Sequence, residues 1–295
     1  MNTTVINITN LSKSYGKARG IEKVNLQIEE GEIFGFIGPN GAGKSTTIRI
    51  LLNLIFPTSG SARILGMDCI KETKKIKQQI GYIPSDANAY TSMSIQDFLN
   101  YCMRYYHVTD GEQRIAKLAD FFELDTKRKI DDLSLGNRKK VSIIQSLIHR
   151  PKVLILDEAT SGLDPLMQAK FFEVLQEENR KGMTIFFSSH ILTEVQLLCK
   201  RVAIIKEGKI IKLEDIETLR KRQIKKVAIE SELPISDAIT KINGIQNFTF
   251  NENRTSSFMY SGNMNDLVNF LAQNNIENLT IEEPSLEEIF MHYYQ

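Results

Sequence analysis

Tryptophan is absent from this sequence of 295 residues, cysteine is rare, and neither sign of charge dominates. The three cysteines, Cys69, Cys102 and Cys199, are far apart and lack metal-ligand spacing, which favours free thiols over a disulfide or a metal site. The net charge of +1 provides no global basic field. Sequence-independent binding of nucleic acid is therefore not expected.

Long apolar segments are also missing. No run of residues approaches the length that crosses a bilayer, and the polar start of the chain lacks the apolar core of a secretory signal. We therefore expect a cytoplasmic location, and any role at a membrane would come through a partner protein.

Short apolar runs alternate with amphipathic segments, which predicts an α/β fold with a buried sheet. Strands are expected at residues 5–8, 24–28, 33–37, 63–65, 80–83, 153–156 and 184–187, and as a hairpin over 202–206 and 209–213. Helices are expected at residues 44–54, from a Ser94 cap onward, at 111–122 and at 166–180.

The pattern changes near residue 220, so we expect one domain over 1–220 and a smaller one over 221–295. In the smaller domain, strands are predicted at 226–230, 248–250, 257–260 and 279–282, and helices at 235–242, 264–274 and 285–293. This βαββαβα order fits a ferredoxin-like α+β sandwich.

A glycine-rich segment follows the apolar run 33–37 and precedes a predicted helix. Its residues are Gly38, Pro39, Asn40, Gly41, Ala42, Gly43, Lys44, Ser45 and Thr46. The spacing matches a phosphate-binding loop, in which glycines let backbone N–H groups and a helix N-terminus face an anion. Lys44 supplies a cation for the outer phosphates, Ser45 a hydroxyl for Mg²⁺, and Thr46 a hydroxyl for a phosphate oxygen. The alternative is a glycine-rich turn with a chance lysine.

Two adjacent carboxylates end the apolar run 153–156. Unpaired charge beside a core is costly, which argues that Asp157 and Glu158 serve chemistry rather than stability. Asp157 can hold Mg²⁺, and Glu158 can polarise an attacking water, as phosphoryl transfer requires. The alternative is a plain strand end with surface acids.

A third segment, Leu133-Ser134-Leu135-Gly136-Asn137, precedes a helical pattern. Ser134 suits a helix N-cap, and a capped helix N-terminus can also bind an anion. The two roles are compatible.

These segments together resemble the nucleotide-binding subunit of an ABC transporter, over about residues 5–213. The phosphate loop is similar to the Walker A motif of this family, 153–158 to Walker B, 133–137 to the signature, 161–164 to the D-loop, and His190 to the switch histidine. The resemblance implies a P-loop NTPase core of the ABC ATPase type, with a helical subdomain at about 85–150, ATP and Mg²⁺ as cofactors, and hydrolysis of ATP to ADP and phosphate.

The resemblance also implies a role for each matching residue. Lys44, Glu158 and His190 would be catalytic, and Tyr15 would stack on adenine, although an aromatic residue after a strand is often simple packing. Two copies would close over two ATP molecules, so that Ser134 and Gly136 of one copy meet the outer phosphate held by the other. Asp164, grouped with the nucleotide-binding residues, would cross the interface.

Four positions depart from the family pattern. Leu135 replaces the first signature glycine and Asn137 the glutamine, while Ala159 stands where proline is usual. Ser85 stands where the family has glutamine, and serine is too short to reach equally far. We expect a water molecule or Asp86 to take over that link, which makes Ser85 or Asp86 a further candidate near the metal.

The family reading implies a homodimer, or a heterodimer with a paralogue, on the inner face of the cell membrane beside a separate transmembrane permease. The tyrosines at 90, 101, 105 and 106 are candidates for docking, with amphipathic packing as the alternative. Residues 17–20, the signature variant and 283–290 resemble exporters of drugs, antibiotics or lantibiotic peptides.

Two rival functions each predict a sequence feature. A soluble ABC ATPase acting on nucleic acid or ribosomes generally has two cassettes or a long coiled-coil insertion, and neither is present. A GTPase switch predicts an Asn/Thr-Lys-x-Asp motif, which is absent after the fourth strand.

Overall fold

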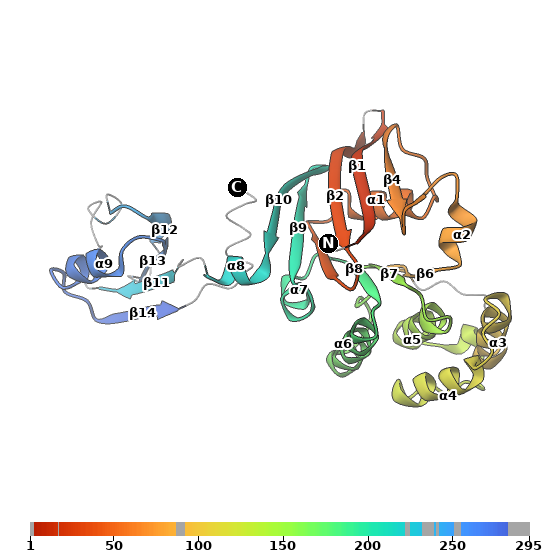
Figure 1. Cartoon of the computed structure of the whole chain (residues 1–295). Helices are drawn as coiled ribbons and strands as arrows, with labels where there is room; N and C mark the ends of the chain where they lie inside the picture. Colours follow the sequence, from red (N-terminus) through yellow and green to blue (C-terminus); the bar gives the residue numbers. More distant parts are fainter. Residues whose placement is uncertain are drawn as a thin grey trace. The chain divides into compact units, whose positions relative to one another are not determined.

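The computed structural model describes residues 3–16, 18–86, 92–221, 225–231, 239, 242–250 and 255–282. The chain divides into two compact units, Met1–Asp215 and Ile216–Gln295. The strands and helices of both units are labelled in Figure 1.

The first unit is built on a six-stranded sheet of order β10-β9-β3-β8-β7-β6. The strands are β3 Ile33–Ile37, β6 Ile80–Ile83, β7 Val153–Asp157, β8 Thr184–Ser189, β9 Arg201–Lys206 and β10 Lys209–Asp215. All neighbours are parallel except the β9–β10 hairpin. Every residue of β3, β7 and β8 is buried. Both faces of these strands are covered, which explains their continuous apolar runs.

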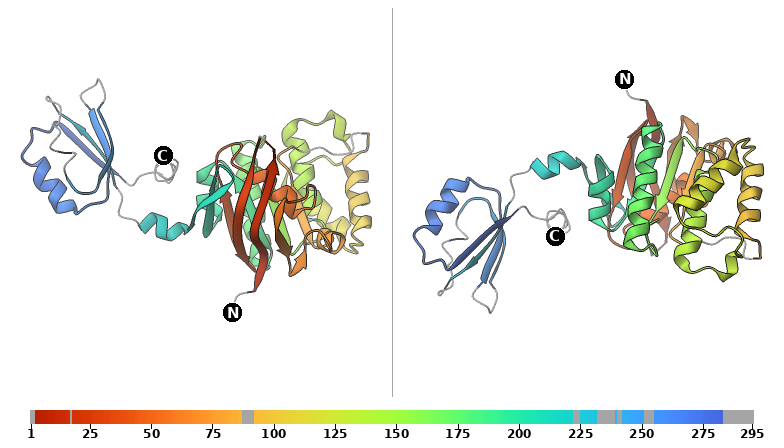
Figure 2. Two further views of the ribbon diagram at one scale, coloured as in Figure 1. Left: turned by 90° about the horizontal axis from the view of Figure 1, so that it is seen from above. Right: turned by 90° about the horizontal axis from the view of Figure 1, so that it is seen from below.

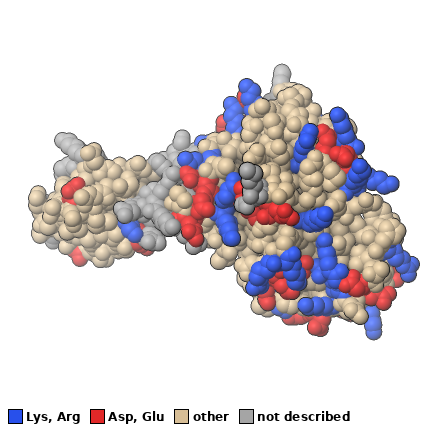
Figure 3. Space-filling model, in the orientation of Figure 1, with Lys and Arg blue, Asp and Glu red and all other residues tan. Residues whose placement is uncertain are grey.

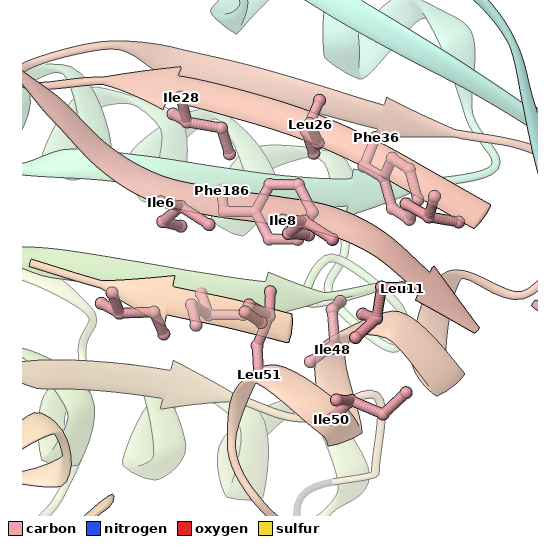
Figure 4. Close-up of a cluster of buried hydrophobic side chains, with 14 of the residues drawn as sticks. Ile6, Ile8, Leu11, Leu26, Ile28, Phe36, Ile48, Ile50, Leu51 and Phe186 are labelled. Carbon is pink, nitrogen blue, oxygen red and sulfur yellow. The ribbon is translucent and has the colours of Figure 1, made fainter. Parts of the chain in front are cut away.

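A second, antiparallel sheet of order β2-β1-β4-β5 lies over one face of the first. Its strands are β1 Thr4–Tyr15, β2 Ala18–Glu29, β4 Ser59–Ile64 and β5 Met67–Asp68. Helix α1, Lys44–Leu51, lies between the two sheets. Figure 4 shows apolar side chains of both sheets and of α1 meeting in one core, among them Ile8, Ile48 and Phe186.

Helices cover the opposite face of the parallel sheet, as the views from above and below show (Figure 2). They include α5 Leu135–Leu147, α6 Pro165–Arg180 and α7 Leu192–Leu198. Helices α3 Ile95–Tyr105 and α4 Gly111–Phe121 pack beside α5. Ser94 caps α3 as predicted, because its hydroxyl accepts a hydrogen bond from the backbone N–H of Asp97 at 3.1 Å.

Several elements differ from the sequence-based expectation. Strands β1 and β2 are much longer than predicted, because they pair along twelve residues each with repeated register shifts, and polar residues occupy exposed positions. Helix α2, Thr73–Lys77, was not expected, since Ile76 is its single buried residue and gives no periodicity. Helix α7 spans only seven residues, too few for a clear amphipathic pattern.

The second unit contains helix α8, Ile216–Lys221, and a four-stranded sheet of order β12-β13-β11-β14. Its strands are β11 Lys225–Glu230, β12 Ile245–Phe250, β13 Thr255–Tyr260 and β14 Asn278–Glu282, all antiparallel. This order is that of a ferredoxin-like sheet. Helix α9, Met264–Leu271, packs its buried Leu267 and Leu271 on the sheet. Most of the helix predicted at 235–242, and all of the one at 285–293, lie outside the described residues.

Acidic and basic side chains are interspersed over the visible face of the larger unit (Figure 3). This mixture agrees with the near-zero net charge of the chain. Among the described residues, no helix combines the length and the apolar composition needed to cross a bilayer.

Candidate nucleotide-binding site

The glycine-rich loop joins strand β3 to helix α1 at the carboxyl edge of the parallel sheet. Gly43 is the residue before the helix and has φ of 111°, a conformation that side chains rarely adopt. At Gly38, an added Cβ atom would lie 2.3 Å from the carbonyl oxygen of Ile205. The glycines thus allow a tight turn of the backbone before α1. In this turn, the N–H groups of the first turn of α1, which have no partner within the helix, face the concave side of the loop.

Lys44 is held inside this loop. Its side chain is only 4% exposed, and Nζ donates hydrogen bonds to the carbonyl oxygens of Gly38 at 2.7 Å and Pro39 at 3.2 Å. The same ammonium lies 3.2 Å from a carboxylate oxygen of Glu158. The structure therefore joins the loop lysine to the strand-end acid that the sequence singled out separately.

Ser45 on helix α1 contacts Asp157 at the end of strand β7. The Ser45 hydroxyl donates to Asp157 Oδ1 at 3.1 Å, and Ser188 on β8 donates to the same oxygen at 3.5 Å. Burial raises the pKa of Asp157, and the hydrogen bond from Ser45 lowers it. The paired hydroxyl and carboxylate oxygens fit Mg²⁺, which takes its remaining ligands from water and phosphate. The described residues contain no cluster of three His, Cys, Asp or Glu side chains that could hold a metal without such help.

Glu158 has an unusual backbone, with φ of 51°. Its N–H continues the ladder by donating to the carbonyl of Ser188 at 3.0 Å. One carboxylate oxygen lies near Lys44, and the other lies 3.4 Å from Nδ1 of His190, whose side chain is 44% exposed. A non-glycine residue held in the left-handed region is common at functional sites, where surrounding contacts compensate the strain.

The turn that carries His190 is fixed by residues to which the sequence analysis gave no role. The Ser189 hydroxyl accepts from the N–H of Ile191 at 2.9 Å and donates to Glu194 Oε2 at 2.7 Å. Glu194 is 4% exposed, although a carboxylate is seldom buried. The spacing of Ser189 and Glu194 gave no signal in the sequence, because the contact depends on the turn into α7.

A cavity of about 290 Å³ brings together eight of the predicted residues. It is lined by Gly20, Asn40, Gly41, Gly43, Lys44, Ser45, Thr46, Ser85 and Glu158. Asp86 is exposed and is not among the lining residues. Residues of the glycine-rich loop, the Lys44 ammonium and the Glu158 carboxylate therefore line one cavity, although they come from distant parts of the sequence. An anion could enter this cavity.

The remaining predicted residues do not line this cavity. Tyr15 ends β1 with 45% of its surface exposed, and Lys13 lies 5.3 Å above its ring. Ser134 and Asp164 are the N-caps of α5 and α6, where their side chains accept from Asn137 N–H at 3.4 Å and from Met167 N–H at 2.9 Å. Gly136 lies in the first turn of α5. Ser134 and Asp164 thus cap helices of their own chain, and neither lines the cavity.

Comparison with known proteins agrees with this geometry. Residues 21–161 match the family described as ABC transporter. The bacitracin transport ATP-binding protein BcrA of Bacillus licheniformis is 32% identical over 98% of this chain and 97% of its own length. This chain belongs to the ABC transporter ATP-binding proteins. The resemblance stated from the motifs is thereby confirmed.

Other ABC proteins show the same relation. The linearmycin resistance ATP-binding protein LnrL of Bacillus subtilis is 31% identical over 96% of each chain. A solved ATP-binding subunit of an ABC transporter has a TM-score of 0.70 at 28% identity, covering 74% of this chain and 92% of its own. A dimeric ATP-binding cassette bound to ADP and phosphate has a TM-score of 0.66 at 25% identity, covering 72% of this chain and 98% of its own.

The predicted fold class is therefore confirmed: this ABC protein has the α/β core of a P-loop ATPase. The family binds and hydrolyses ATP, and its cassettes work as dimers with a transmembrane subunit. This chain is accordingly an ATP-hydrolysing subunit of a transporter.

Proposed function

We propose that this ATPase powers export of a drug, antibiotic or peptide through a separate permease on the inner face of the cell membrane. The names of the relatives support this cargo class: they refer to bacitracin transport, linearmycin resistance and a probable multidrug transporter. Each of these cargoes belongs to its own protein, and for this chain the class alone is proposed. Residues 283–290, whose pattern resembles the exporter branch, lie outside the described residues.

The single observation that carries the site assignment is the cavity that Lys44, Ser45 and Glu158 line together. We propose that residues 38–46 cradle the phosphates of ATP, with Lys44 facing the outer ones. Ser45 and Asp157 would hold Mg²⁺, which when bound offsets phosphate charge. The 3.1 Å contact between Ser45 and Asp157 supports this pairing, because both oxygens can turn to one ion.

Glu158 is the proposed base that polarises the attacking water. Its place between Lys44 and His190, within 3.2 Å and 3.4 Å of them, supports this role, because both neighbours orient the carboxylate. His190 would then face the outer phosphate. Tyr15, exposed at the end of β1, would stack on adenine.

Closure requires a second copy of this chain, or a paralogue. Ser134 and Gly136 of that copy would reach the outer phosphate, and Asp164 would cross the interface. The exposure of Ser134 and Asp164 supports an interface at these helix starts. We propose that residues 1–220 form the ATPase domain, with a helical subdomain at about 85–150, and that 221–295 form an accessory domain.

The tyrosines predicted to dock the permease separate into two kinds. Tyr101 and Tyr105 on α3 are 56% and 65% exposed. The ring of Tyr106 instead stacks on His149, with centroids 3.9 Å apart. Tyr90 lies outside the described residues. We propose that Tyr101 and Tyr105 face the permease, whereas Tyr106 serves packing.

A Glu158→Gln variant tests the function directly. With ATP and Mg²⁺ it should form a stable dimer in light scattering, because it binds nucleotide without completing hydrolysis. The unaltered chain should copurify with a membrane protein from detergent-solubilised membranes and hydrolyse ATP beside it. A variant that stays monomeric in excess nucleotide, together with an unaltered chain without turnover, would contradict the proposal.

A further inference from the structure

Lys139 on helix α5 turns into the protein, whereas its neighbours Arg138 and Lys140 are partly exposed. Its exposed fraction is 0%, and its Nζ donates to the carbonyl oxygens of Ser85 at 2.6 Å and Pro84 at 2.9 Å. Burying an ammonium group is costly unless it is hydrogen-bonded and paired. These two backbone contacts therefore fix the segment after β6 against the side of α5.

The negative charges of three carboxylates favour the charged form of Lys139 and so raise its pKa. They belong to Asp86, which is exposed on the same loop, and to Asp157 and Glu158 at the end of β7. Burial acts in the opposite direction and lowers the pKa of Lys139. Lys139 does not line the cavity. Lys139 can therefore influence the site only indirectly, through its hydrogen bonds to the segment 84–85 and through its positive charge.

The position of Lys139 along α5 connects it to the segment 133–137. The helix begins at Leu135, directly after its cap Ser134, so Lys139 lies about one turn further along. The backbone hydrogen bonds of α5 join Lys139 to the first turn of the same helix. A shift of its first turn would change the Nζ–carbonyl distances, to which hydrogen bonds are sensitive.

We propose that Lys139 is a positioning residue for ATP hydrolysis. It joins the Ser134 turn, which closes over the nucleotide of a second copy, to the carboxylate site of its own chain. The inference rests on the proposed function and deepens it. It assigns the link between helix α5 and the site to Lys139. In this chain the side chain of Ser85 is too short to provide such a link itself.

The test compares Lys139→Met with Lys140→Met, a matched control that changes the next lysine in the same way. Both are made in the full-length chain and assayed for ATPase with the copurified membrane subunit. Lys139→Met should lower kcat by roughly 10-fold to 100-fold, as loss of supporting contacts around a site typically does. The KM for ATP and the affinity for a fluorescent ATP analogue should stay within about twofold, because Lys139 does not touch the nucleotide.

Two further variants separate positioning from simple packing. Lys139→Arg keeps a donor and a charge and should retain kcat within about threefold of the unaltered chain. Adding Ser85→Gln to Lys139→Met should recover part of the lost kcat, since a longer polar side chain can rebuild the link from the loop. Thermal unfolding is recorded for every variant, and Lys140→Met should match the unaltered chain in all readouts.

The inference is overturned if Lys139→Met retains full kcat. It is also overturned if Arg, Met and the double variant lose kcat, affinity and thermal stability together, because that pattern describes packing alone. These results leave the proposed function intact when the unaltered chain hydrolyses ATP. An unaltered chain that binds no ATP contradicts the function and the inference together.

Discussion

Helices α1 and α6 both begin at a motif of the ATP-binding family, but their first turns are built differently. Helix α1 starts after Gly43 and has no side-chain cap, whereas α6 starts after Asp164, whose carboxylate accepts from Met167 N–H at 2.9 Å. An uncapped turn keeps its N–H groups for a ligand. A turn capped by a carboxylate has used one N–H and would repel a phosphate.

Helix α5 lies between these two cases. Its cap Ser134 is neutral, and its hydrogen bond to Asn137 N–H is long, at 3.4 Å. A hydroxyl can also donate to a phosphate oxygen, which a carboxylate cannot. The comparison therefore ranks the three helix starts as anion sites, with α1 first, α5 second and α6 last.

The largest effect is expected at α1. Lys44→Ala should lower kcat/KM for ATP by about 10²–10³-fold, as removal of one preorganised charge-stabilising group typically does. Lys75→Ala is the matched control, because Lys75 is 71% exposed in a surface ion pair and should change nothing measurable. Steady-state ATPase measures both. Equal ATPase activities of the two variants would contradict the role of the α1 start as the strongest anion site of the three.

Much of this site could be predicted because each motif is local in the sequence. The loop at 38–46 and the acids at 157 and 158 follow apolar strands, and parallel strands bring their ends to one edge. Lys139 and Glu194 could not be predicted in the same way. Their partners, Ser85 and Ser189, are joined to them by tertiary contacts and by the short turn into α7.

The secondary structure shows the same limit. Strand β3 was predicted with its observed bounds because all five residues are apolar and buried. Strand β1 extends to Tyr15 through polar residues that show no strand pattern in the sequence. Backbone pairing with β2 keeps these residues in the strand. Tertiary pairing overrides local propensity in such strands.

A second effect is expected from the backbone of α1. Gly43→Ala should lower the free energy of unfolding by about 1–3 kcal/mol, because alanine is strained at φ of 111°. Its Cβ would also lie 2.6 Å from the Ile21 side chain. Chemical denaturation measures the loss, and ATP affinity should fall with it. Gly182→Ala is the control, because Gly182 has a similar φ of 103° with open space around it. This variant introduces backbone strain at a position outside the nucleotide site. ATP affinity that falls equally in both variants would contradict a specific role for the α1 turn.

Asp164 separates capping from a role between copies. Asp164→Ala should destabilise the chain by about 1 kcal/mol through loss of the cap, whereas Asp164→Ser retains a cap and should restore most of this. Both variants should weaken ATP-dependent dimerisation in the Glu158→Gln background, because serine lacks the carboxylate proposed to cross the interface. Denaturation and light scattering give the two readouts. Normal dimerisation of Asp164→Ser would limit Asp164 to capping.

The smallest change in stability is expected at Ser134. Its 3.4 Å cap is long, so Ser134→Ala should cost only about 0.5 kcal/mol, the lower end of the range for N-caps. Ser94→Ala on α3 removes a shorter cap of 3.1 Å and should cost more. Dimerisation should show the reverse order: in the Glu158→Gln background with ATP, Ser134→Ala should weaken the dimer and Ser94→Ala should not. Dimers of equal strength would show that the α5 turn serves the helix alone, because a residue that touches the phosphate of a second copy must affect association more than folding.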